Sequence, residues 1–221
     1  MAAPGAFAAG PDLAPHQITV VSAGLGVNFT GGMSLGSAAE LRQILLDNPG
    51  VQVIHLNSPG GLVDEARQFF DLIQRRQLIT TTDRYCLSAC ALAFLGGRQR
   101  YLATGAKLGF HSEFADHASE TEVEAKEEFD KRTMRTLGIP QPFIDKAFSI
   151  PSDQIWIPKV SELEDAHIID GVTDEYVLDP APAAGSTAGK ATSSTHVGGS
   201  GTPAVEETPD GITIYRGSGA N

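Results

Sequence analysis

Two glycines end a run of apolar residues at Asn57-Ser58-Pro59-Gly60-Gly61, where a buried strand is predicted to stop and a helix to begin. Gly60 and Gly61 let the backbone turn tightly and leave its N–H groups uncovered, so a carbonyl or an oxyanion could approach them closely. The chemistry that this favours is stabilisation of negative charge by backbone donors. A plain strand-to-helix turn would have the same composition.

A serine lies at the predicted start of a helix of small residues, in the stretch Cys86-Leu87-Ser88-Ala89-Cys90. The first N–H groups of a helix lack partners and the helix dipole is positive there, so this position favours developing negative charge. Ser88 could therefore be a nucleophile, with the N–H of Ala89 as an oxyanion donor. The flanking residues are not the Gly-x-Ser-x-Gly turn of the α/β-hydrolases, and a simple helix N-cap is the alternative.

His111 ends the strand-like segment AKLGF, just before a run of acidic residues. A histidine at the exit of a strand can present its imidazole to a neighbouring helix start, which is what a general base must do. A structural histidine is the alternative. The remaining histidines lack such a setting: His16, His55, His117, His167 and His196.

The two cysteines, Cys86 and Cys90, are too few for a disulfide scaffold, and a structural zinc would need ligands from elsewhere in the chain. Side chains four residues apart on a regular helix face the same way but seldom meet disulfide geometry, so two buried thiols are expected. An irregular turn before Ser88 would permit a bond. Such a bond would stiffen the segment around Ser88 and indicate an extracytoplasmic compartment.

Alternating strands and helices must position these residues, and the apolar pattern predicts them between residues 17 and 179. Strand-helix-strand units of this length imply right-handed crossovers and a mainly parallel sheet with helices on its faces. Strands are expected at 17–29, where the strand is bent or interrupted, at 51–57 and 78–82, and as a pair at 100–102 and 107–111. Helices are expected after Ser37, at 62–75 and 88–95, in the acidic segment, near 142–148 and at 160–166.

Composition excludes two classes of protein. The chain has 221 residues, a hydrophobic fraction of 41% and no run of about 18 apolar residues, which excludes a membrane-spanning helix. The formal net charge of −11 argues against a nucleic-acid partner, because such proteins need a basic face. Most of the excess charge lies in residues 112–130, which we interpret as a solvated helix face.

The two ends of the chain differ from its middle. Residues 1–16 are rich in Ala, Gly and Pro, and residues 180–221 are of low complexity, so both are expected to be disordered around a domain at 17–179. The segment ITIYR at 212–216 is the exception, since it could pair with a sheet edge. The first residues do not form an intact signal peptide, which predicts a cytoplasmic protein or one cut from a periplasmic or membrane-anchored precursor.

Taken in order, these motifs resemble the ClpP and crotonase superfamily, specifically the ClpP-like serine peptidases, over about residues 18–177. LNSPGG resembles the glycine-rich oxyanion strand of that family, and CLSACALAFLGGRQRYLATGAKLGFH resembles its nucleophile helix and the strands that end in the catalytic histidine. LEDAHIIDGV resembles the closing helix. The resemblance implies an α/β fold: a spiral of strand-strand-helix units with a mainly parallel sheet and helices packed outside.

The resemblance also implies a role for each motif residue. Ser88 would form the acyl-enzyme, and His111 would take its proton and return it to the leaving amine. The N–H groups of Gly61 and Ala89 would form the oxyanion hole, with Gly60 shaping the turn. No cofactor or metal is implied.

The third member of the triad departs from the family pattern. Counting back from IIDGV places Ile155 where the family has an aspartate. Asp153, two residues earlier, is our predicted third member, and it needs a bulge or a shifted loop to reach His111. Asp145 is the alternative, and with neither in place little or no activity is expected.

We therefore predict an ATP-independent, ClpP-like serine endopeptidase. Its polypeptide substrate would lie extended between the 57–61 segment and the strand leading to His111. The family uses the excursion after the histidine to build oligomers, so a homo-oligomer is expected. The alternatives are an acyl-CoA thioester-binding enzyme of the crotonase type, which needs no Ser-His pair, and a catalytically silent ClpP-like scaffold.

Overall fold

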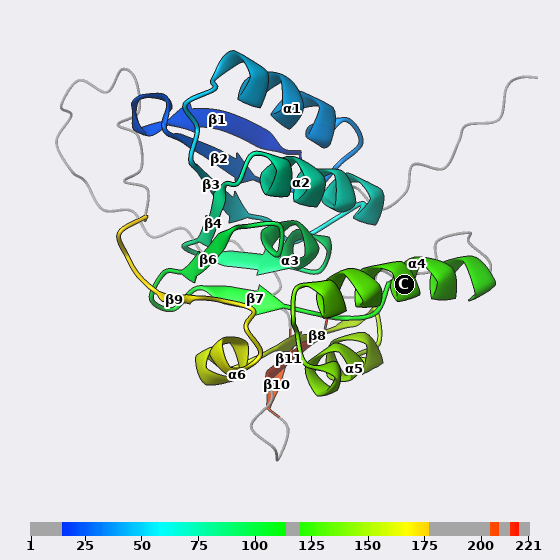
Figure 1. Ribbon diagram of the computed structural model, residues 1–221. Helices are drawn as coiled ribbons and strands as arrows, with labels where there is room; N and C mark the ends of the chain where they lie inside the picture. Colours follow the sequence, from blue (N-terminus) through cyan, green and yellow to red (C-terminus); the bar gives the residue numbers. More distant parts are fainter. Residues whose placement is uncertain (1–14, 114–119, 177–203, 208–212, 217–221) are drawn as a thin grey trace, which may run out of the picture.

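The computed structural model describes residues 15–113, 120–176, 204–207 and 213–216. A six-stranded sheet crosses this part of the chain in the order β1-β2-β3-β4-β6-β9 (Figure 1). β1 and β2 are antiparallel, and the other neighbours are parallel, as the repeated strand-helix units predicted. The strands are β1 (Gln17–Val21), β2 (Gly26–Thr30), β3 (Val53–Asn57), β4 (Ile79–Thr82), β6 (Gln99–Leu102) and β9 (Gly171–Val172).

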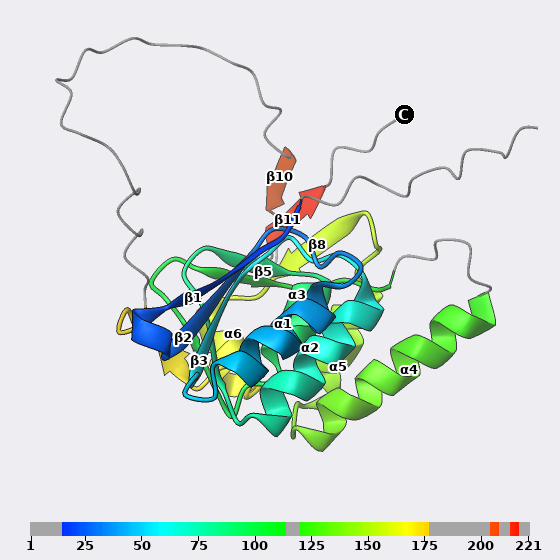
Figure 2. The ribbon, with the colours of Figure 1, turned by 90° about the horizontal axis from the view of Figure 1, so that it is seen from above.

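Three helices cover one face of this sheet: α1 (Ser37–Asp47), α2 (Val63–Arg75) and α3 (Ala89–Phe94) (Figures 1 and 2). α2 turns Ala66, Phe69 and Ile73 inward at helical spacing, and all three are fully buried. α1 has no capping side chain of its own. The buried Glu65 of α2 replaces one, because its carboxylate accepts hydrogen bonds from the backbone N–H groups of Gly36 and Ala38 at 3.0 and 2.8 Å.

Two smaller sheets lie where the chain approaches the predicted site. β5 (Tyr85–Leu87) pairs in parallel with β7 (Lys107–Gly109), while β8 (Gln154–Ile157), β11 (Thr213–Arg216) and β10 (Ala204–Glu207) form an antiparallel sheet. Single bridges join the pieces: Ser58 to Cys86, and Phe110 to Trp156. The ends of β3, β5, β7 and β8 are therefore neighbours, although their residues are far apart in the sequence.

Three further helices complete the described part of the chain: α4 (Glu120–Thr136), α5 (Gln141–Ser149) and α6 (Val160–Asp165). Arg67 ties α4 to α2, because its Nε and Nη2 donate to the two carboxylate oxygens of Asp130 at 2.9 Å each. None of the helices in the described ranges is both long and apolar enough to cross a membrane.

The structure corrects some of the predicted strands. The expected pair at 100–102 and 107–111 is wrong, because β6 joins the main sheet and β7 pairs with β5 instead. The interrupted strand at 17–29 is an antiparallel pair around a 3-10 turn at Ser22–Gly24. β5 and β8 were not predicted.

Part of the C-terminal segment pairs as expected. The predicted edge strand ITIYR contains β11, which lies against β8. The expected disorder of residues 1–16 and 180–221 falls mostly outside the described residues.

Candidate functional site

A cavity of about 720 Å³ brings the three predicted motifs together. Gly61, Ser88, Ala89 and His111 all line it. They reach it from the start of α2, the start of α3 and the end of β7. The tertiary structure thus gathers the Ser88 hydroxyl, the His111 imidazole and the backbone of Gly61 and Ala89 around a single space.

Ser88 lies at a sharp reversal between β5 and α3. Its backbone has φ 56° and ψ −129°, which a residue with a side chain rarely adopts. Its N–H donates to the carbonyl of Gly109 at 2.9 Å, which ties the reversal to the strand that leads to His111. Ser88 occupies the N-cap position of α3, but its side chain makes no capping hydrogen bond, so the hydroxyl is left for other chemistry.

His111 is held by its neighbour in the chain. The carbonyl oxygen of Ser112 lies 2.6 Å from Nδ1. A carbonyl can only accept, so Nδ1 carries the hydrogen in this contact and Nε2 presents a lone pair. Burial lowers the pKa of His111 below its ordinary 6.5, against the opposing effect of the Ser112 hydrogen bond, and this keeps the imidazole neutral at pH 7.

The turn between β3 and α2 packs directly against the reversal at Ser88. Gly60 has φ 102°, and a Cβ at this position would lie 2.8 Å from the Cβ of Ser88. Gly61 has φ 144°, and a Cβ there would lie 2.6 Å from the carbonyl oxygen of Met33. Both positions therefore require glycine, for conformation and for space.

Two residues that line the cavity, Gly61 and Ala89, have backbone N–H groups without a hydrogen-bond partner in the described part of the chain. Gly61 forms a parallel bridge with Met33. Two hydrogen bonds of 2.8 Å make this bridge: the N–H of Met33 donates to the carbonyl of Gly60, and the N–H of Leu62 donates to the carbonyl of Met33. The N–H of Gly61 is not used by this bridge. Ala89 is the first residue of α3, where N–H groups have no partner within the helix. Within the described ranges, neither N–H makes a hydrogen bond.

The predicted third member, Asp153, lies in a loop opposite His111. Phe110 and Trp156 exchange hydrogen bonds at 2.9 and 3.0 Å, and the N–H of Ser112 donates to Ile150 at 2.9 Å. Between these two contacts, His111 alone on one side faces five residues on the other, the turn at 151–153 and the first two residues of β8. The third-member role of Asp153 stays a prediction, because this arrangement does not by itself bring its carboxylate to His111.

Among the residues that the structure describes, no carboxylate makes a hydrogen bond or ion pair with the imidazole. Asp153 is exposed, and among the described residues it makes no hydrogen bond or ion pair with His111. Asp145 is exposed on α5, where its Oδ1 accepts a hydrogen bond from Gln141 at 2.7 Å. The group that orients His111 in the structure is the Ser112 carbonyl.

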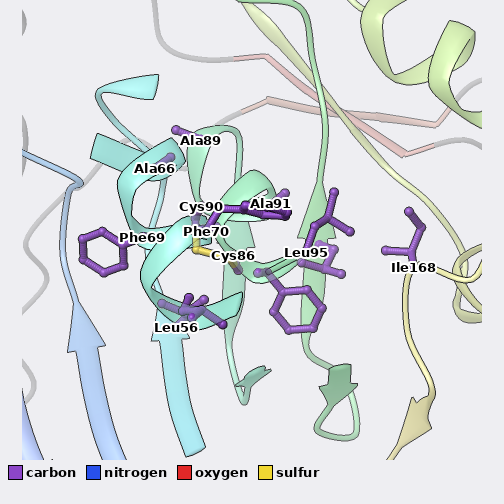
Figure 3. Packing of buried hydrophobic residues seen from close by; sticks show 14 of the residues in the cluster. Leu56, Ala66, Phe69, Phe70, Cys86, Ala89, Cys90, Ala91, Leu95 and Ile168 are labelled. Atoms are coloured by element: carbon purple, nitrogen blue, oxygen red, sulfur yellow. A yellow bond between two sulfur atoms is a disulfide. The ribbon is translucent and has the colours of Figure 1, made fainter. Parts of the chain in front are cut away.

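Cys86 and Cys90 form a disulfide, so the expectation of two buried thiols is wrong. The reason is the irregular turn at Ser88, which brings the two Cα atoms to 5.1 Å. Both residues are fully buried, and Figure 3 shows the bond among side chains of the hydrophobic cluster. A nucleophilic role for Cys86 is excluded in this oxidised state, because no thiolate is present.

Charged residues at the cavity were missed by the sequence analysis. Glu113 and Asp130 line it, and burial raises the pKa of both carboxyl groups although the guanidinium of Arg67 opposes this. The interpretation of residues 112–130 as a solvated face is therefore wrong for Asp130, which is 6% exposed. No local pattern signals this pairing, because Arg67 lies on another helix.

The residues that the structure describes contain no cluster of three or more His, Cys, Asp or Glu side chains suited to a metal ion.

Comparison with solved structures finds the same fold in ClpP1 from Listeria monocytogenes, with a TM-score of 0.60 and 18% identity over 68% of this chain and 92% of that one. A point mutant of the same protein matches with a TM-score of 0.55 and 20% identity over 70% and 94% of the two chains. No protein-family model matches the sequence, and no curated protein does. The chain therefore has a ClpP-like fold, as the motifs predicted.

Proposed function

We propose that this ClpP-like chain is an ATP-independent serine endopeptidase that cleaves peptide bonds through an acyl-enzyme on Ser88. One observation carries the proposal: Ser88, His111, Gly61 and Ala89, from three separate stretches, line one cavity. A nucleophile, a base and two backbone donors around one space are the parts that acyl transfer requires.

His111 would act as the general base. With the hydrogen of Nδ1 directed at the Ser112 carbonyl, Nε2 is free to take the proton of the Ser88 hydroxyl as it attacks the substrate carbonyl. The same nitrogen then gives that proton to the leaving amine. A water molecule, deprotonated in the same way, would release the acyl group.

Gly61 and Ala89 would form the oxyanion hole. Their N–H groups make no hydrogen bond within the described residues, and both residues line the cavity. Donors placed in advance stabilise the charge on the tetrahedral intermediate, and losing one such donor costs about 2.7–4 kcal/mol of transition-state stabilisation.

The substrate class is a polypeptide in extended conformation. Leu92, Leu95, Met134 and Phe148 give the cavity an apolar wall beside Ser88, suited to a hydrophobic side chain. The disulfide favours an oxidising, extracytoplasmic compartment for this activity, since such bonds seldom persist in a reducing cytosol.

A second candidate, a catalytically silent scaffold, has one observation in its favour: His111 contacts a backbone carbonyl where a catalytic triad has a carboxylate. Loss of that carboxylate lowers the turnover of serine peptidases by about four orders of magnitude. The experiment below separates the two candidates.

A fluorophosphonate probe, which reacts with activated serines, tests the proposal on the full chain. Labelling is expected for the unmodified chain and is expected to disappear in Ser88→Ala and in His111→Ala, with circular dichroism unchanged. Labelling should persist at pH 6.5 and weaken only in more acidic solution, because burial lowers the pKa of His111 below its ordinary value and protonated His111 cannot accept a proton. No labelling of the folded, unmodified chain at any pH would instead support the scaffold.

A further inference from the structure

A disulfide spans the serine that we propose as the nucleophile. Cys86 is the middle residue of β5 and Cys90 is the second residue of α3, so Ser88 lies midway between them. Both cysteines are 0% exposed. The bond thus closes a small covalent ring that contains the backbone of Ser88 and its two neighbours.

The chain must reverse at Ser88 for this ring to close. Four residues of extended strand would separate the two Cα atoms by about 13 Å, and a regular helix would separate them by about 6 Å. The observed separation is 5.1 Å. Ser88 supplies the reversal through its positive φ of 56°, so the disulfide and the unusual conformation of the serine depend on each other.

The strand side of the ring is anchored by backbone hydrogen bonds. The N–H of Ser58 donates to the carbonyl of Tyr85 at 2.9 Å, and the N–H of Leu87 donates to the carbonyl of Ser58 at 3.0 Å. The N–H of Ser88 donates to Gly109 at 2.9 Å. Up to Ser88, the backbone is therefore held by two neighbouring segments.

On the helix side, the hydrogen-bonded anchor among the described residues is at the far end of α3, where the hydroxyl of Thr80 donates to the carbonyl of Phe94 at 2.8 Å; the first turn is held by packing. α3 has six residues, and its N-terminus receives no side-chain cap. A helix of this length has no stability of its own and depends on its packing. The bond from Cys90 to Cys86 ties the first turn of α3, which carries the Ala89 N–H, to the anchored strand.

We propose that the Cys86–Cys90 disulfide is a positioning element for catalysis: it holds Ser88 and the Ala89 N–H in reacting geometry. The inference rests on the proposed function of Ser88. Reacting groups must be placed within about 0.5 Å, and a displacement of about 1 Å can cost a hundredfold in rate. A bond that only stabilised the domain would lower the melting temperature when removed but would leave the reactivity of Ser88 in the folded chain unchanged.

The test measures the second-order rate constant of fluorophosphonate labelling in the full chain. The double variant Cys86→Ala/Cys90→Ala removes the bond and keeps small apolar side chains in place. Ala93→Gly is the matched control, since Ala93 is buried in the same helix and its loss weakens α3 without touching the disulfide. We expect labelling to slow at least tenfold in the double variant and less than twofold in the control, with folded circular dichroism spectra for both.

The outcomes separate this inference from the proposed function. Equal labelling of the double variant and the unmodified chain overturns the inference alone, whereas no labelling of the unmodified chain overturns the proposed function and the inference with it. If the double variant does not fold, the unmodified chain reduced by a water-soluble phosphine replaces it; the phosphine takes the oxygen of one water and leaves two thiols. Slower labelling restored by reoxidation supports the inference, and unfolding on reduction overturns it.

Discussion

Ser112 holds the imidazole of His111 through its backbone carbonyl, 2.6 Å from Nδ1. In a serine triad, a carboxylate normally fixes the tautomer at this nitrogen and stabilises the imidazolium that forms. The carbonyl can do the first of these but carries no full charge for the second. Stabilisation of the imidazolium therefore requires a carboxylate, which Asp153 in the turn at 151–153 would have to supply.

Asp153→Asn tests this role. If Asp153 completes the triad, we expect fluorophosphonate labelling to slow at least tenfold, because the neutral amide cannot stabilise the imidazolium. Asp145→Asn is the matched control on the neighbouring helix and should label as the unmodified chain does. An unchanged rate in Asp153→Asn would mean that the Ser112 carbonyl alone orients His111, and a loss confined to Asp145→Asn would transfer the role to that residue.

His55 gives the chain a pH-dependent stability that is separate from the site. It lies in β3, is 3% exposed, and its Nδ1 has no hydrogen-bond partner within the described ranges. Burial lowers its pKa from 6.5 to about 4, although the nearby charge of Asp83 opposes this. Between these two pH values the unfolded chain binds a proton that the folded chain does not, so stability falls as the pH falls and levels off below about 4.

Replacing this residue should remove the effect. We expect the unmodified chain to lose about 3 kcal/mol from His55 between pH 6.5 and 4, and His55→Leu to lose that much less over the same range. Urea unfolding of both chains at a series of pH values measures the difference. Parallel stability curves for the two chains would contradict the prediction.

At the scale of elements, two turns packed against each other form the site. The β3–α2 turn and the β5–α3 reversal touch at Gly60 and Ser88, where there is no room for a methyl group. Neither turn belongs to the main sheet, but the Ser58–Cys86 bridge aligns them. The position of the nucleophile therefore depends on a glycine that lies 28 residues earlier in the sequence.

Gly60→Ala tests this packing. The new Cβ would meet the carbonyl oxygen of Leu87 at 2.7 Å and the Cβ of Ser88 at 2.8 Å. We expect a loss of roughly 1–3 kcal/mol of stability and labelling slowed at least tenfold, because the reversal must shift. Gly105→Ala is the control: its φ is 83° but no atom lies within 4 Å, so it should cost stability without slowing the labelling of the folded chain.

At the scale of the whole molecule, the C-terminal strands extend the sheet that contains β8. β11 pairs with β8 over four residues, and β8 is bridged to Phe110, the residue before His111. Strands 204–207 and 213–216 thus connect the end of the chain to the segment that carries the proposed base.

Deleting residues 204–221 should therefore destabilise the domain. Loss of the hydrogen bonds between these strands and β8 should lower the free energy of unfolding by about 1–2 kcal/mol, which corresponds to a melting temperature lower by roughly 2–8 °C. Differential scanning calorimetry measures the change, and deletion of residues 217–221 alone is the control. An unchanged melting temperature in the longer deletion would show that these strands add little to the fold.

Much of this architecture could be predicted from the sequence. The apolar spacing in α2 and the buried runs in β3 and β4 predict their elements to within two residues, because a face turned to a core leaves a periodic pattern. The motifs around Gly60, Ser88 and His111 could be found for a related reason, because each lies at the end of a predicted element. Glycine permits a tight turn there, serine is typical of a helix start, and histidine follows the end of a strand.

What the sequence determined by itself was the set of chemical groups and the class of fold, since composition, periodicity and motif order are properties of a chain read one segment at a time. The tertiary structure alone decided the disulfide, the pairing of Arg67 with Asp130 and the contact of His111 with Ser112. The pairing of Arg67 with Asp130 joins two helices far apart in the sequence, whereas the disulfide and the His111 contact depend on the backbone dihedral angles of a few residues. Periodicity and motif order specify neither of these.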